Sequence, residues 1–348
     1  RDYYASRGLG DVYKRQKPFY YYETEDGQLL YGTMIRDIMK QPGFVKKLNE
    51  EMLQLYLSLT YVAGENTFFR GLKKLMPGRY LIWQNGRLTI KRYWKPEFHP
   101  DESKSLEDWA DEIHSTIQEI MPEVKTADEK VESFLSGGVD SSYVLAMSDA
   151  EQADCCGYEE ERFDESVLAE KTAQLLGRKF SRSIITPEQF FDIVPYVMYN
   201  MEQPLGDASA IVFTLGCNAT AEHTKICYSG EGSDEFFGGY NMYRNAERYG
   251  ENLKNFYVGN TNIMKEDEKQ KILKKYDPDV LPIELARGIY EETEGLDPLT
   301  KMSDVDIQIW LEGDIYLNVD KMSTAAGLEI RMPLTDRRIF DIASRMPS

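Results

Sequence analysis

Ser136-Gly137-Gly138-Val139-Asp140-Ser141-Ser142 is the stretch that decides the fold we expect for this chain. The apolar residues before it (131–135) are predicted to form a buried strand, and residues 141–150 a helix. Two adjacent glycines at such a junction let backbone N–H groups point at a common centre, and the helix N-terminus adds partial positive charge. An ordinary glycine turn is the alternative, but the composition of the whole stretch favours a phosphate-binding loop.

The polar side chains of this loop indicate which phosphate it binds. Asp140 supplies a carboxylate for a Mg²⁺ that a nucleotide carries, while Ser136, Ser141 and Ser142 offer hydroxyl donors to phosphate oxygens. The loop has no lysine and lacks the Gly-x-x-x-x-Gly-Lys-Ser/Thr spacing of loops that grip terminal phosphates. The loop would instead suit a pyrophosphate group that leaves during the reaction. The residues resemble the PP-loop of the ATP pyrophosphatases, which activate carboxyl or carbonyl oxygens by adenylation.

The composition of the chain excludes several classes of function. Its 348 residues suffice for two domains, and its formal net charge of -18 argues against nucleic-acid or anionic-membrane partners. Short apolar runs and a mean hydropathy of -0.51 predict no transmembrane helix, and no signal peptide is recognisable, so we expect a cytoplasmic protein. The cysteines have no zinc-ligand spacing and are expected to be buried thiols: Cys155, Cys156, Cys217 and Cys227.

The first hundred residues are predicted to contain three different parts. Residues 1–16 do not fit the pattern that follows, and we expect a foreign or misassembled segment there, which we exclude from the fold. Residues 17–95 are β-rich, with hairpins predicted around the turns Asp26-Gly27 and Asn85-Gly86. The proline-containing, acidic residues 96–104 are predicted to be a linker between domains.

Residues 105–348 are predicted to form an α/β domain. A helix over 106–121, capped by Ser105, opens it. Strands and helices then alternate, with strands expected at 131–135, 153–158, 180–185 and 225–229 and helices at 141–150, 165–176, 187–200 and 208–222. Such alternation predicts a doubly wound parallel sheet with ligands at the carboxyl ends of its strands, followed here by a helical C-terminal part. The loops after residues 135 and 228 should therefore open into one crevice.

Two further segments carry unusual combinations of residues. The run from Ser229 to Tyr240, SGEGSDEFFGGY, combines four glycines with three carboxylates. A solvated acidic loop would explain its charge, but not glycines spaced for close approach to a ligand or two phenylalanines in its middle. The second segment runs from Val319 to Asp336. Its Lys321 could be an ordinary surface lysine, but small and apolar neighbours suggest that it lies near a protected site.

Together, three motifs resemble the synthetase domain of glutamine-hydrolysing asparagine synthetase. They are the loop at Ser136, the run from Ser229, and the segment from Asp320-Lys321-Met322-Ser323 to Asp336. The similarity runs from about Lys17 to the end of the chain. Residues 17–94, including Lys17-Pro18-Phe19-Tyr20-Tyr21, are similar to the closing part of that family's N-terminal glutaminase, an Ntn-type class II amidotransferase domain.

The resemblance implies a reaction, its cofactors and its site residues. ATP, with Mg²⁺, would adenylate the side-chain carboxylate of aspartate, and ammonia would displace AMP to give asparagine. The loop from Ser136 to Ser142 would hold the pyrophosphate part of ATP, Glu231 would be the base for the incoming ammonia, and Lys321 would stabilise charge on the phosphates. The implied Mg²⁺ contacts are Asp140 and Asp234, and the implied adenosine contacts are backbone groups of Leu135, Cys156, Ser229 and Gly230.

The chain departs from the family pattern in several places. Position 1 is arginine and no cysteine precedes Cys155, so we expect an N-terminally truncated chain that cannot take ammonia from glutamine. The chain also stops before the last helices that the family leads us to expect. Leu334-Thr335-Asp336 replaces the usual Phe-Leu-Asp. The stretch from Glu202 to Ser209 only approximates the family's Glu-Pro-x-x-Asp-x-Ser, which makes aspartate less secure as the substrate than ATP.

Two alternatives to asparagine synthesis stay open. A related amide-forming enzyme, of the β-lactam synthetase or peptide-cyclase type, would keep the ATP loop and change the acceptor pocket around Asp207 and Glu231. A non-catalytic ATP-binding regulator would be expected to lack Glu231 or Lys321, and both are present. We expect small molecules, not nucleic acid or membrane, as partners, and leave a homodimer open.

Overall fold

The computed structural model describes residues 3–7, 17–125 and 130–348. Its central sheet has five strands in the order β11-β10-β7-β8-β9, and every neighbouring pair is parallel. The strands are β7 (Val131–Phe134), β8 (Gln152–Tyr158), β9 (Lys179–Ile185), β10 (Ile226–Tyr228) and β11 (Glu329–Arg331). The predicted doubly wound parallel sheet is confirmed, and β11 is an additional edge strand that the sequence pattern did not predict.

The order of the strands creates a switch point between β7 and β10. The chain runs outward from β7 to β8 and β9, and then returns to place β10 on the other side of β7. At such a point the two connections leave the sheet in opposite directions, which opens a crevice at the carboxyl ends of the strands. The loops that begin at Leu135 and Ser229 follow β7 and β10, so both lie at this crevice.

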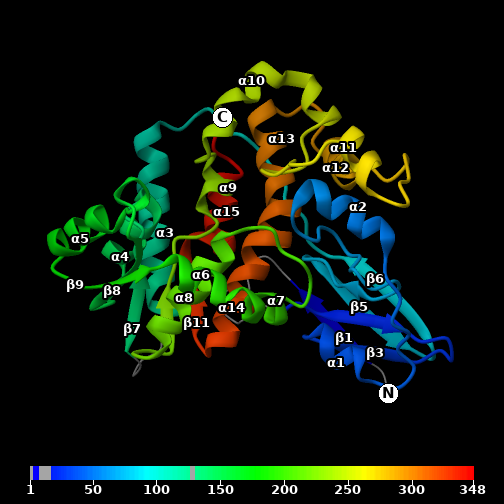
Figure 1. Cartoon of the computed structure of the whole chain (residues 1–348). Helices are drawn as coiled ribbons and strands as arrows, with labels where there is room; N and C mark the ends of the chain where they lie inside the picture. Colours follow the sequence, from blue (N-terminus) through cyan, green and yellow to red (C-terminus); the bar gives the residue numbers. More distant parts are fainter. Residues whose placement is uncertain (1–2, 8–16, 126–129) are drawn as a thin grey trace.

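Helices cover both faces of the sheet (Figure 1). One apolar core lies between the sheet and α3 (Leu106–Val124), α4 (Val139–Met147), α5 (Ser166–Leu175) and α15 (Arg337–Ala343). A smaller core on the other face joins β10 and β11 to α8 (Ser209–Ala221) and α14 (Tyr316–Ala326). The expected cap of α3 is present, since Ser105 and Asp108 form a reciprocal capping box.

The predicted extent of one helix is wrong. The sequence pattern predicts a single helix over 187–200, but the structure has two, α6 (Pro187–Asp192) and α7 (Val194–Met201). Pro195 lies near the start of α7 and has no N–H to donate to the preceding turn, so one continuous helix would lack a hydrogen bond there. The break falls at Ile193, two residues before this proline.

The C-terminal part is helical, as expected, and includes an unusual π-helical segment, η5 (Asp306–Ile315). It continues directly from α13 (Pro298–Val305) and leads into α14. The remaining elements of this domain are η2 (Glu161–Phe163), α9 (Ser233–Phe237), η3 (Asn241–Asn245), α10 (Ala246–Tyr249), η4 (Gly250–Asn255), α11 (Glu266–Ile272), α12 (Ile283–Glu292) and η6 (Pro333–Thr335). Over the described residues, no helix combines the length and apolar character that a membrane span requires.

The N-terminal region is β-rich and contains both predicted hairpins. One three-stranded antiparallel sheet has the order β3-β2-β4 and the other β1-β5-β6. Asn85 and Gly86 both have positive φ, as a two-residue hairpin turn requires. The elements are β1 (Tyr3–Arg7), β2 (Tyr20–Glu23), β3 (Leu29–Gly32), α1 (Ile35–Met39), α2 (Glu50–Leu59), β4 (Lys73–Lys74), β5 (Arg79–Gln84) and β6 (Arg87–Arg92).

Strand β1 lies in the segment that the sequence reading excluded from the fold. It pairs antiparallel with β5, from Tyr3 opposite Trp83 to Arg7 opposite Arg79. Residues 1–2 and 8–16 lie outside the described residues, so the foreign origin of residues 1–16 stays a prediction. The proposed domain boundaries at 95 and 105 also stay predictions.

Buried contacts hold the N-terminal region against the synthetase-like domain. Lys74 on β4 and Glu312 on η5 form an ion pair of 2.7 Å with both side chains at most 3% exposed. Glu202, after α7, accepts hydrogen bonds from the backbone N–H groups of Ile35 (3.0 Å) and Arg36 (2.9 Å). Such charges are costly to bury alone, so each depends on its partner across the boundary.

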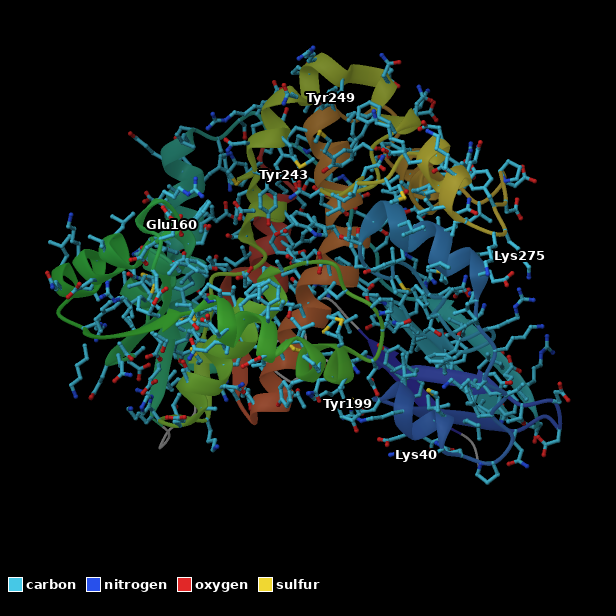
Figure 2. The ribbon with its side chains drawn as sticks, in the orientation of Figure 1. Lys40, Glu160, Tyr199, Tyr243, Tyr249 and Lys275 are labelled. Carbon is cyan, nitrogen blue, oxygen red and sulfur yellow. The ribbon has the colours of Figure 1, made fainter. Side chains whose placement is uncertain are left out.

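The helical part also buries a carboxyl group that has no basic partner among the described residues. Asp306 accepts hydrogen bonds from the hydroxyls of Tyr243 (2.5 Å; labelled in Figure 2) and Tyr257 (2.6 Å). Burial raises the pKa of Asp306 to about 7. The folded protein therefore holds a proton on this group that the unfolded chain, with an ordinary carboxyl pKa, releases at much lower pH.

We expect Asp306→Asn to flatten the pH dependence of stability. Because the folded pKa is raised, the contribution of this group is fully favourable below about pH 4 and is lost as the pH rises to about 7. The variant should lose a slope of up to about 1.4 kcal/mol per pH unit in that window. Urea unfolding at pH 4 to 8 would measure it, with the exposed Asp192→Asn as the control. An unchanged slope in Asp306→Asn would contradict the assignment.

Candidate functional site

The two loops at the switch point contact each other through their backbones. Gly230, two residues beyond β10, lies against the first turn of α4. A Cβ atom at Gly230 would be 2.7 Å from the backbone nitrogen of Ser141 and 2.8 Å from the carbonyl carbon of Asp140. Only glycine fits such an approach. The sequence expectation that both loops open into one crevice is thus confirmed by direct contact.

The loop after β7 has the geometry of an anion cradle. Gly137 has a φ of +87°, and Gly138 is the N-cap of α4 but has no side chain to cap the helix. Within the loop, the hydroxyl oxygens of Ser136 and Ser141 lie 3.0 Å apart, and the N–H of Gly138 donates to Ser136 Oγ at 3.2 Å. The first turn of α4 therefore presents its N–H groups, with two hydroxyls beside them, toward the crevice.

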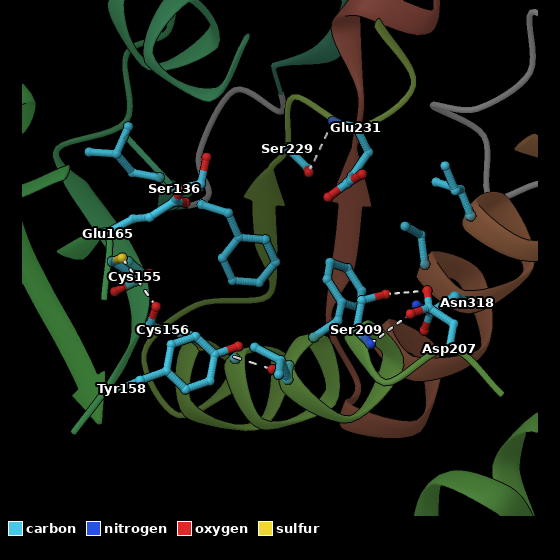
Figure 3. Close-up of a pocket in the computed structure, with 18 of the residues that line it drawn as sticks. Ser136, Cys155, Cys156, Tyr158, Glu165, Asp207, Ser209, Ser229, Glu231 and Asn318 are labelled. Atoms are coloured by element: carbon cyan, nitrogen blue, oxygen red, sulfur yellow. Dashed lines mark hydrogen bonds between the residues drawn. The ribbon is translucent and has the colours of Figure 1, made fainter. Parts of the chain in front are cut away.

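A cavity of about 320 Å³ lies next to this cradle, between the sheet and α8. Five of the residues expected to contact a nucleotide or to act as base line it: Leu135, Ser136, Cys156, Ser229 and Glu231. Figure 3 shows Cys155, Cys156 and Tyr158 at one end and Glu231, Asp207 and Asn318 at the other. Burial raises the pKa of the thiols of Cys155 and Cys156 to about 12 and 11, which keeps both neutral.

Other predicted site residues surround the cavity without lining it. The structure places Gly137, Gly138, Asp140, Ser141 and Ser142 in the loop and first turn of α4. Gly230 packs on that turn, and Asp234 lies in α9. The four cysteines are free thiols, as expected.

Carboxylates dominate the electrostatics of this site. The Glu231 side chain is exposed to the cavity but has protein around most of it, and desolvation raises its pKa, with further increases from Asp234, Asp207 and Asp140. Burial and the charge of Asp140 also raise the pKa of Asp234. A carboxylate with a raised pKa holds protons more readily, which suits a general base acting near neutral pH.

Asp140 and Asp234 fit a divalent cation that arrives with a nucleotide. Their mutual repulsion raises the pKa of Asp234, and a cation between them would relieve it. Within the described part of the chain, no three His, Cys, Asp or Glu side chains are close enough together to cage a metal ion. This pairing of two carboxylates with a phosphate cradle is typical of Mg²⁺ bound partly by substrate oxygens.

Lys321 lies outside the cavity. Its ammonium forms an ion pair with Glu202 at 2.5 Å, and the two side chains are only 2% and 3% exposed. It also lies 5.4 Å from the ring centre of Tyr20 in the N-terminal region. Burial lowers the pKa of Lys321, although Glu202 opposes the change. The structure therefore separates this predicted catalytic residue from Glu231 and the serine loop.

At the Glu231 end of the cavity, sequence reasoning named Asp207 in the expected acceptor pocket but missed Asn318. Asp207 accepts hydrogen bonds from the backbone N–H of Ser209 (2.8 Å) and from its hydroxyl. Asn318, on α14, is 6% exposed and lines the cavity, and its Oδ1 has no hydrogen-bond partner among the residues that the structure describes. The spacing of Asp207 and Ser209 at the start of α8 was a usable signal. Nothing in the sequence around Asn318 marks it.

Comparison with known proteins places this geometry in a family. Residues 112–348 match the family described as asparagine synthase, and residues 14–94 match the glutamine amidotransferase domain. The chain belongs to the asparagine synthase family. The resemblance inferred from the three sequence motifs is thus confirmed.

Named relatives extend along nearly the whole chain. Asparagine synthetase [glutamine-hydrolyzing] 1 from Bacillus subtilis is 30% identical over an alignment of 382 positions, covering 97% of this chain and 60% of that protein. A putative asparagine synthetase from Mycobacterium bovis is 27% identical, covering 90% of this chain and 54% of its own length. Amidase chyE from Penicillium rubens is 28% identical over 64% of this chain and 36% of its own. The chain thus spans little more than half the length of its asparagine synthetase relatives.

We expect Gly230→Ala to weaken nucleotide binding. The added methyl group would meet backbone atoms of α4 that cannot move aside without shifting the serine loop. A displacement of about 1 Å in such a cradle should cost on the order of tenfold or more in affinity. Calorimetric titration with ATP and Mg²⁺ would measure the change. Gly288→Ala, where the Cβ atom meets open space in α12, is the matched control, and wild-type affinity in Gly230→Ala would contradict the geometry.

Proposed function

We propose that this chain catalyses the ATP-dependent amidation of a carboxylate, through an acyl-adenylate, with release of AMP and pyrophosphate. Aspartate is the acceptor and asparagine the product that the names of the relatives suggest. Ammonia is the nitrogen donor. The observation that carries the proposal is the meeting of the serine loop with the Glu231 loop at one cavity of the switch point.

ATP would lie along the cavity with its phosphates on the serine loop. The N–H groups at the start of α4 and the hydroxyls of Ser136, Ser141 and Ser142 would hold the pyrophosphate part. Backbone groups at Leu135, Cys156, Ser229 and Gly230 would contact the adenosine part. Mg²⁺ between the phosphates and the carboxylates of Asp140 and Asp234 would offset the charge that gathers on the leaving pyrophosphate.

Adenylation requires the acceptor carboxylate near the α-phosphorus. One carboxylate oxygen attacks that phosphorus, the bond from the α-phosphorus to the bridging oxygen of pyrophosphate breaks, and pyrophosphate leaves. In the proposal Lys321 stabilises the negative charge on the leaving pyrophosphate. For this, its ammonium would have to leave Glu202 and contact a phosphate oxygen. The lowered pKa of Lys321 shows that its charge is held in an unfavourable environment, which favours such an exchange.

Amide formation then occurs at the Glu231 end of the cavity. The nitrogen lone pair of ammonia attacks the carbonyl carbon, the bond from that carbon to the oxygen of AMP breaks, and the nitrogen releases a proton. In the proposal Glu231 accepts this proton, which its position at the cavity and the burial that raises its pKa support. The related amide-forming enzymes and the non-catalytic regulator remain the alternatives.

We expect Glu231→Gln to separate the two halves of the reaction. Carboxylate-dependent pyrophosphate release should persist, because the glutamine keeps the shape of the side chain, while amide formation should fall by about 100-fold or more without the base. Mass spectrometry of products with ammonium as donor, alongside a pyrophosphate assay, would measure both. If both halves fall together, Glu231 is not the base.

We expect Lys321→Ala to abolish adenylation, but Glu202, which would lose its buried Lys321 partner and keep only Arg36 at 3.9 Å as a basic neighbour, would also destabilise the fold. The double variant Lys321→Ala/Glu202→Gln removes both charges and should recover stability. Its ATP–pyrophosphate exchange should stay about 100-fold or more below wild type. Thermal unfolding and exchange measured on the same samples would separate the two effects, and near-normal exchange in the double variant would refute the role of Lys321.

A further inference from the structure

A threonine at the contact between the N-terminal region and the rest of the chain has a backbone conformation that its side chain disfavours. Among the described non-glycine residues, three have positive φ: Thr60, Asn85 and Glu202. Asn85 lies in a hairpin turn, where asparagine is common. Thr60, which follows α2, has a φ of +67°. A β-branched residue rarely adopts this conformation, and it keeps it only where surrounding contacts hold it there.

The contacts that hold Thr60 come from both parts of the chain. Its N–H donates to the carbonyl of Tyr56 at 2.7 Å, which closes the last turn of α2. Its own carbonyl accepts the N–H of Gly206, in the segment between α7 and α8, at 2.6 Å. The residues beside these two are buried in one apolar core: Leu59, Tyr61 and Leu205. The backbones of Thr60 and Gly206 are therefore fixed against each other.

The side chain of Thr60 also sets how closely Gly206 approaches. A Cβ atom at Gly206 would lie 2.9 Å from the Cβ of Thr60 and 3.4 Å from its Cγ2. The hydroxyl of Thr60 instead donates to the carbonyl of Leu59 at 2.5 Å. The aliphatic part of the threonine side chain thus faces Gly206, and only glycine allows this approach while the threonine is present.

Gly206 directly precedes a residue that lines the cavity. Asp207 and Ser209 both lie at the Glu231 end of the cavity (Figure 3). The carboxylate of Asp207 accepts the N–H of Ser209, at the start of α8, at 2.8 Å. Asp207 is therefore held to α8 through its side chain and to the N-terminal region through the residue before it. A displacement of Gly206 would move Asp207 with it.

We propose that Thr60 is a positioning residue for the acceptor: through Gly206 it fixes Asp207 at the end of the cavity where the carboxylate substrate binds. The N-terminal region, which matches the glutamine amidotransferase domain, would then contribute to amidation even when ammonia is supplied directly. The inference rests on the proposed function, because it concerns the acceptor of the same site. The proposed contacts of ATP do not include this segment, so the effect is confined to the acceptor.

Two single variants of the whole chain test the contact from its two sides. Gly206→Ala should raise the KM for aspartate by about tenfold or more, because the methyl group meets the Cβ of Thr60. Thr60→Gly relieves the backbone strain but loosens the contact, so it should raise this KM by about fivefold and change Tm by less than about 4 °C. Neither variant should change the KM for ATP. Pyrophosphate release with ATP, Mg²⁺, aspartate and ammonium would measure both constants.

The double variant Thr60→Gly/Gly206→Ala gives the sharpest test. Without the threonine side chain, the nearest of the recorded contacts of a Cβ at position 206 would be the carbonyl oxygen of residue 60, at 3.4 Å. The second substitution should therefore add nothing to the first, and the KM for aspartate should equal that of Thr60→Gly. Asn85→Gly, which replaces a non-glycine residue of positive φ in a hairpin turn, is the matched control and should leave both KM values unchanged.

The outcomes separate this inference from the proposed function. If the unaltered chain releases no pyrophosphate with aspartate, asparagine synthesis fails and the inference fails with it. If it does, but Gly206→Ala leaves the KM for aspartate unchanged or raises the KM for ATP equally, amidation stands and the positioning role is refuted. Effects of the two substitutions that multiply in the double variant would also overturn it. If Gly206→Ala fails to fold, Thr60→Gly decides, since an unchanged KM for aspartate in that variant refutes the role.

Discussion

The parallel pairing of β7 with β10 is the contact on which the site depends. It sets Tyr228 opposite Ser133, so the chain leaves both strands at the same edge of the sheet. The residues that begin the two loops, Leu135 and Ser229, are 94 positions apart in the sequence. The backbone at Gly230 can then reach the first turn of α4. The proposed phosphate loop and the proposed base, Glu231, are thereby positioned by a sheet, which is stiffer than the loops that carry them. No side-chain contact between the two loops is needed to align them.

Much of this arrangement was predictable because its signals are local. Strand periods, the Ser105 cap and the Asn85-Gly86 turn each lie within a few residues, and all three were confirmed. The parallel sheet followed from the alternation of strands and helices. The features that were not predicted have only a weak signal in the local sequence or depend on residues far away along the chain. Strand β11 has three residues, too few to show an alternation of apolar and polar side chains. It forms by pairing with the edge of β10.

The side-chain environment of the site was less predictable for the same reason. The residue that holds Lys321 is Glu202, on a different element and 119 positions away, and no spacing rule connects them. Asn318 carries no motif, and only its burial without a partner marks it. The glycines around Glu231 indicated a loop that approaches a ligand closely, and the family resemblance implied the role of Glu231 as base. Sequence patterns thus identified the candidate site residues, whereas the neighbouring residues that contact them could be identified only from the structure.

The segment from Glu202 to Ser209 has a consequence for how the two parts of the chain can be recombined. Glu202, Gln203 and Gly206 bind the backbone of the N-terminal region, at Ile35 and Arg36, Phe68 and Thr60 respectively, while Asp207 and Ser209 line the cavity. This segment of eight residues therefore both contacts the N-terminal region and contributes to the lining of the cavity. A chimera that exchanges the N-terminal region with a relative must therefore carry a compatible copy of this segment, and such an exchange also affects residues that line the cavity.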